Sequence, residues 1–140
     1  MNSKKLIQIA IIGFMSIFFF SFAWASSDTQ TVVLEATPDH PEANGTAVID
    51  DTHVSIQARG LKSNAVYTVW FVNMKPKKKV TGAGMMPYMF RTDKWGDGNY
   101  SASLSETPVG KWAMVMVVLH PNDDPKDMDN MVGALKAPLQ

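Results

Sequence analysis

The sequence predicts an all-β fold, an antiparallel β-sandwich with a short C-terminal helical segment. Short runs of β-branched and aromatic residues recur after residue 30, and turn-forming residues separate them at intervals of about eight to twelve positions. This pattern is typical of sandwiches with about seven strands. The candidate strands are residues 31–36, 46–50, 53–59, 66–73, 88–92, 100–104 and 112–120.

Two of these runs also indicate how their strands are buried. In residues 53–59, every second residue is apolar, so one face is expected in the core and the other in solvent. Both faces of residues 112–120 are apolar, which predicts a central strand covered on both sides. One face of that strand carries Val115, Val117 and Leu119. The other face carries Trp112, Met114, Met116, Val118 and His120.

The chain changes character after Pro121. Asp124, Pro125 and Asp127 have the order of an N-cap, a first-turn proline and an acidic residue of a capping box. A short helix is therefore predicted over residues 125–132, with Met128 on the same face as Met131 or Val132. Two readings of residues 133–140 stay open, a final edge strand and an unstructured tail.

The segment from Gly60 to Tyr67 has the sequence Gly-Leu-Lys-Ser-Asn-Ala-Val-Tyr. It resembles the corner of fibronectin type III and related immunoglobulin-like domains, in which a leucine is followed six residues later by a tyrosine that begins a strand. The resemblance covers about a dozen residues and implies an immunoglobulin-like architecture, with the hydroxyl of Tyr67 bonded back to the chain. It implies no function.

The first 25 residues have the pattern of a secretory signal peptide. Lys4 and Lys5 precede an apolar run over residues 6–23, and the segment ends in Ala23-Trp24-Ala25. We expect cleavage after Ala25, which leaves residues 26–140 as a single periplasmic or secreted domain. The alternative is an uncleaved leader that anchors the protein in the membrane, because the run is nearly long enough to span a bilayer.

Composition excludes several classes of function. The chain has no cysteine, which excludes disulfides, thiolate metal sites and cysteine nucleophiles. It has 13 basic and 13 acidic residues, and the loss of Lys4 and Lys5 with the leader leaves a net charge of about −2. Nucleic acid is therefore not an expected partner, because its binding requires a basic face.

Methionine is the most distinctive candidate for chemistry in the exported part. In a protein without thiols, thioethers are the soft ligands available for Cu(I). Trp112, Met114 and Met116 alternate on one strand face that ends at His120, and this set of residue types is similar to the sites of small periplasmic copper and silver chaperones. The alternative is that methionine simply fills gaps in the core. The candidate metal ligands are Met85, Met86, Met89, Met114, Met116, His120, Met128 and Met131.

Three of these candidates have further interpretations. Met85 and Met86 follow Gly82 and Gly84 and precede a proline, so they are expected in a loop, where an exposed apolar cluster indicates a metal or a protein partner. His120 is the best histidine candidate, at a strand end before an acidic segment. Its alternative role is a structural brace that bonds to nearby carboxylates.

No sequence motif indicates catalysis, since there is no nucleophile elbow, phosphate-binding glycine loop or zinc-protease histidine pair. The sequence therefore predicts a non-catalytic binding module of the cell envelope, which binds a soft metal such as Cu(I). The alternative is a protein-interaction or envelope-assembly module that uses the segment from Met74 to Met89 and the lysine run Lys75, Lys77, Lys78 and Lys79. Converging thioethers favour the first, and thioethers spread over an exposed patch favour the second.

Overall fold

A computed structural model describes residues 29–140, so the predicted signal peptide lies outside the described residues. Nine strands and no helix occur in this part of the chain. The strands are β1 (Gln30–Ala36), β2 (Asn44–Ile49), β3 (His53–Arg59), β4 (Val66–Asn73), β5 (Lys79–Gly82), β6 (Met89–Arg91), β7 (Gly98–Ser103), β8 (Met114–His120) and β9 (Val132–Pro138). All seven predicted strands are present, and two of them, β3 and β4, have the predicted bounds.

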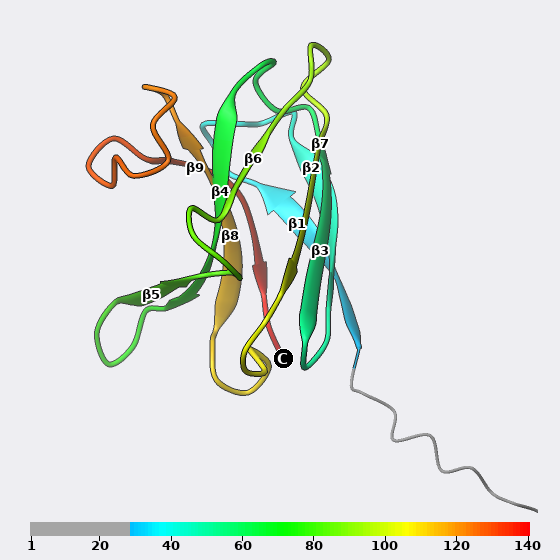
Figure 1. Cartoon of the computed structure of the whole chain (residues 1–140), viewed down its shortest axis with the longest axis vertical. Coiled ribbons are helices and arrows are strands. Elements are labelled where there is room, and N and C mark those ends of the chain that lie inside the picture. Colours follow the sequence, from blue (N-terminus) through cyan, green and yellow to red (C-terminus); the bar gives the residue numbers. More distant parts are fainter. Residues whose placement is uncertain (1–28) are drawn as a thin grey trace, which may run out of the picture.

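The strands form one antiparallel sheet in the order β5-β4-β8-β9-β1-β2-β3-β7, and β6 pairs with β4 on the edge that β5 also uses. The sheet is continuous because β1 pairs with β2 through its first five residues and with β9 through Glu35 and Ala36. As a result the sheet curls around its core (Figure 1). The all-β antiparallel prediction is confirmed, whereas the predicted sandwich of separate sheets is wrong.

The core lies inside the curl and follows the alternation of the strands. Val54, Ile56 and Ala58 of β3 are buried, as predicted, and they face the core with Val115 and Val117 of β8. Strand β8 lies between β4 and β9, which confirms its prediction as a central strand. Strands from distant parts of the sheet, such as β3 and β8, therefore share a single hydrophobic core.

The corner before β4 has the predicted contact. Tyr67 is fully buried, and its hydroxyl accepts a hydrogen bond from the backbone N–H of Lys62 at 2.9 Å. His40 Nε2 lies 3.1 Å from the same oxygen. Tyr67 thereby ties the segment before β4 to the loop between β1 and β2.

The predicted C-terminal helix is wrong. Residues 121–131 form turns, because aspartate side chains capture backbone N–H groups two residues ahead: Asp124 Oδ1 accepts from Lys126 at 2.9 Å, and Asp127 Oδ1 accepts from Asp129 at 3.1 Å. Such bonds compete with helical hydrogen bonding. Val132 then begins β9, which is an interior strand between β8 and β1 and neither an edge strand nor a tail.

Candidate functional site

The outer face of the sheet, away from the core, carries several of the candidate ligands. Met116 of β8 lies opposite Trp70 of β4, and Val118 lies opposite Thr68. Because side chains alternate along a strand, Met114 lies on the same face as Met116. Both methionines are half-buried, whereas Val115 and Val117 between them are in the core. The outer face of β4 and β8 is thus apolar but only partly covered.

The turns of residues 121–131 lie over this face and create a hollow of about 170 Å³. Three methionine side chains line it, namely Met116 from β8 and both Met128 and Met131 from the turns. Trp70 lines the same hollow, and Met128 is 42% exposed. The remaining lining residues are Val72, Lys78, Val80, Val118 and Gly133. The structure therefore brings three thioethers and one indole ring to one solvent-accessible site.

Hydrogen bonds within the turns hold the two distal methionines in place. Asn122 Nδ2 and Asn130 Nδ2 both donate to Asp127 Oδ2, at 2.9 and 2.8 Å. These bonds, that of Asn130 most of all, lower the pKa of the Asp127 carboxyl below its ordinary value. A charged Asp127 therefore fixes the segment on which Met128 and Met131 lie.

A buried hydrogen-bond chain positions the indole of Trp70. Trp70 Nε1 donates to Thr68 Oγ1 at 2.7 Å, and the same oxygen lies 2.7 Å from His120 Nε2. Thr68 and His120 are almost completely buried. The hydroxyl of Thr68 accepts one hydrogen bond and carries one hydrogen, so it can serve both neighbours at once.

The contacts of His120 differ from those that both expectations require. His120 is not among the residues that line the hollow, and its partner is Thr68 rather than a carboxylate. Its Nδ1 atom is buried without a hydrogen-bond partner. His120 is the buried end of the hydrogen-bond chain that runs through Thr68 to Trp70, and Trp70 lines the hollow.

The other predicted ligands lie elsewhere. Met85 and Met86 are 82% and 81% exposed in the turn before β6, whereas Met89 is half-buried in β6 and pairs with Thr68 of β4. None of these three, nor Met114, is among the residues that line the hollow. The eight predicted ligands are thus divided between one three-thioether cluster and several separate positions.

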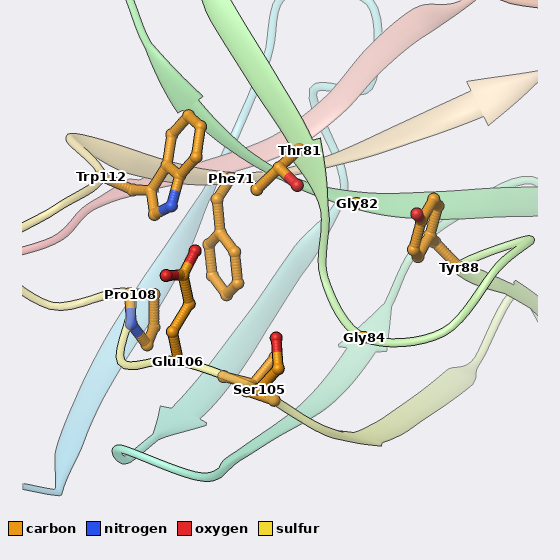
Figure 2. Close-up of a pocket in the computed structure, with 10 residues that line it drawn as sticks. Phe71, Thr81, Gly82, Gly84, Tyr88, Ser105, Glu106, Pro108 and Trp112 are labelled. Carbon is orange, nitrogen blue, oxygen red and sulfur yellow. The ribbon is translucent and has the colours of Figure 1, made fainter.

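Trp112 also departs from its expected place. The strand begins at Met114, and Trp112 belongs to a preceding turn in which its N–H donates to Pro108 O at 2.9 Å. Its ring lines a second cavity of about 120 Å³ with Phe71, Thr81 and Glu106 (Figure 2). Trp70, and not Trp112, lies beside the clustered methionines. The alternation of Thr68, Trp70 and Val72 in residues 66–73 could have indicated this, because it places Trp70 on the face opposite the core residue Phe71.

Within residues 29–140, no three histidine, aspartate or glutamate side chains gather as they would around a metal ion. The same residues contain no helix long and apolar enough to cross a membrane. Comparisons with protein-family models, with curated proteins and with solved structures found no match for this chain.

Proposed function

We propose that the protein is an exported, non-catalytic module that binds a soft metal ion, Cu(I), in the hollow over β4 and β8. The observation that carries the proposal is the convergence of Met116, Met128 and Met131 on one site beside Trp70. Soft thioether sulfur selects Cu(I) over harder divalent ions. The absence of cysteine leaves methionine as the soft donor that this chain can offer.

Solvent access distinguishes this cluster from ordinary core packing. Methionine that fills a core gap is buried on all sides. Here Met116 and Met131 are half-buried and Met128 is exposed, so an ion can reach the site without unfolding the sheet. The face of an indole ring attracts cations, and the hydrogen bond from Trp70 to Thr68 restricts the orientation of that ring.

One charge opposes the metal. Lys78 is the charged residue among those that line the hollow, and its ammonium group repels a cation. It is exposed, so salt screens much of this repulsion. Neutralising it by Lys78→Gln should strengthen Cu(I) binding by roughly twofold at low ionic strength.

The test is an anaerobic Cu(I) competition titration of the purified protein and of single methionine-to-leucine variants. Leucine conserves volume and apolar character, so these changes remove sulfur with little effect on stability. We expect one-to-one binding that weakens by at least about tenfold in Met116→Leu and Met131→Leu, which corresponds to about 1.4 kcal/mol. The matched control is Met85→Leu with Met86→Leu, which should leave the affinity unchanged. Absence of binding, or equal losses in the control, would refute the site.

A second candidate function rests on a separate observation. Met74, Met85 and Met86 are more than half exposed, and the four lysines between residues 75 and 79 are all exposed. This segment is not a simple loop, because it contains β5 at the edge of the sheet. Exposed apolar side chains beside a basic run are the features of a contact surface for a protein partner in the envelope.

A photo-crosslinking amino acid at position 86 tests this alternative in intact cells. If the segment contacts a protein partner, position 86 gives an adduct of one defined mass. The matched control is position 33, because Val33 is 70% exposed on β1, away from the lysine run. Equal adducts at both positions, or none at position 86, would leave the metal site as the supported function.

A further inference from the structure

A second cavity, of about 120 Å³, lies on the other face of β4 and β5 from the three-methionine hollow. Phe71 and Thr81 line the cavity, whereas their sequence neighbours Trp70, Val72 and Val80 line the hollow. The two sites share no lining residue, as the alternation of side chains along a strand requires. A ligand of this cavity is therefore independent of the proposed metal.

The wall of the cavity combines aromatic rings with one carboxylate. Phe71 and Trp112 supply the rings beside the carboxylate, whereas the ring of Tyr88 packs against Trp70, and Glu106 is the charged residue among those that line the cavity. Figure 2 shows the Glu106 carboxylate directed towards the space between the rings of Phe71 and Trp112. Aromatic faces and a carboxylate both attract cations, so the electrostatics of the wall favour a positively charged ligand.

The segment that carries Trp112 is fixed before any ligand arrives. Asn73 at the end of β4 bonds to both sides of this residue, because its Nδ2 donates to Lys111 O at 3.0 Å and its Oδ1 accepts from the N–H of Ala113 at 2.7 Å. Pro108 accepts from the N–H groups of Lys111 and Trp112. The backbone that carries Trp112 is thus preorganised, which lowers the entropic cost of binding.

The chain itself shows that the carboxylate accepts an ammonium group. Lys111 Nζ lies 2.6 Å from Glu106 Oε2. Both side chains are more than half exposed, and exposed ion pairs of this kind contribute little to stability. Lys111 is not among the lining residues, so an external cation can replace it from the cavity side.

We propose that this cavity binds a small organic cation of the methylated ammonium class. Its volume equals that of about four water molecules, which suits a tetramethylammonium-sized head group and excludes large ligands. Methyl groups on the nitrogen pack against Phe71, Trp112 and the buried ring of Pro108, which offer no side-chain acceptors. The polar side chains of the wall are Thr81, Ser105 and Glu106. The positive charge is balanced by Glu106.

Isothermal titration of the purified protein with choline chloride tests the proposal, with sodium chloride added to keep the ionic strength constant. The decisive comparison is 3,3-dimethyl-1-butanol, which has the shape of choline and no charge. We expect choline to bind at one site and the neutral alcohol to bind at least about fivefold more weakly, because cation–π attraction and the carboxylate act on charge alone.

Variants locate the site. Trp112→Leu and Glu106→Gln should each weaken choline binding by about threefold or more, and Lys111→Gln should strengthen it by about twofold because the internal competitor is gone. The matched control for Lys111→Gln is Lys136→Gln, which makes the same change in charge at an exposed side chain of β9 and should have no effect. Glu106 is exposed, so its variant stays informative even if Trp112→Leu fails to fold.

Three results would overturn the proposal: no heat with choline, equal binding of the neutral alcohol, or affinities that do not change in Glu106→Gln. None of them bears on Cu(I) binding, because the titration contains no metal and the variants leave the methionine hollow intact.

Discussion

Replacing Thr68 by valine tests how the outer face of β4 is supported. Valine has the shape of threonine without the hydroxyl, so the change removes one oxygen that serves two neighbours. Trp70 Nε1 and His120 Nε2 each lie 2.7 Å from that oxygen. After the substitution both nitrogens lose this partner, and His120 has no other, since its Nδ1 is already unpaired.

The magnitude follows from the burial of the two groups. An unsatisfied buried polar group costs about 1–3 kcal/mol. His120 is 1% exposed, so its cost lies near the upper end of this range, whereas Trp70 is half-buried and its cost lies near the lower end. The added methyl group returns about 0.8 kcal/mol through apolar burial. The free energy of unfolding should therefore fall by about 3 kcal/mol.

Urea unfolding followed by tryptophan fluorescence measures this loss, and Thr68→Ser is the matched control. Serine keeps the hydroxyl and loses one methyl group, which costs about 1 kcal/mol. The account predicts that Thr68→Val is clearly less stable than Thr68→Ser. This prediction is refuted if Thr68→Val is as stable as the unmodified protein, or if Thr68→Ser is less stable than Thr68→Val. Either result would mean that the hydrogen-bond chain does not stabilise the outer face of β4.

Three further predictions follow from the corner and the leader. Tyr67→Phe removes the acceptor of the Lys62 N–H and should lower the free energy of unfolding by about 1–2 kcal/mol in urea, and an unchanged midpoint would contradict the corner. Burial lowers the pKa of His40 in the folded protein, so the unfolded chain is protonated first as the pH falls below about 6.5. Stability should therefore fall from pH 7 to pH 5 and fall less in His40→Gln; equal slopes would contradict this. Expression of the full sequence in bacteria should give an exported protein whose intact mass begins at Ser26, and a mass that includes residues 1–25 would indicate an anchor.

Local features of the fold could be predicted because they depend on short stretches of sequence. The alternation in β3 defines its buried face without reference to any partner strand. The resemblance of the segment from Gly60 to Tyr67 to a fibronectin type III corner implied that the Tyr67 hydroxyl bonds back to the chain, and it accepts from the N–H of Lys62. Both features involve residues that lie close together in the sequence.

The curl of the sheet could not be predicted, because it depends on which distant strands pair. Strand β9 lies between β8 and β1, and β1 divides its pairing between β2 and β9. The helix prediction failed for a local reason, since the capping pattern at Asp124 also suits a turn in which the aspartate side chain accepts from Lys126.

The candidate site was likewise predictable only where it depends on local sequence. The alternation of residues 112–120 placed Met114 and Met116 on one face, but it could not show that the strand begins only at Met114 and leaves Trp112 in a turn. Met128 and Met131 were selected as thioether donors, and the helix predicted to carry them is replaced by turns. They line the hollow because turns return the chain across β4 and β8, which is a tertiary effect.

The most direct test of the central claim is an NMR titration of protein labelled with ¹³C in its methionine methyl groups, with Ag(I) as a diamagnetic stand-in for Cu(I). Each methionine gives its own signal, so every thioether is observed at once. The account predicts that one equivalent of metal shifts the signals of Met116, Met128 and Met131 and leaves those of Met85 and Met86 in place. Shifts confined to Met85 and Met86, small shifts spread over all signals, or no shifts at all would contradict it.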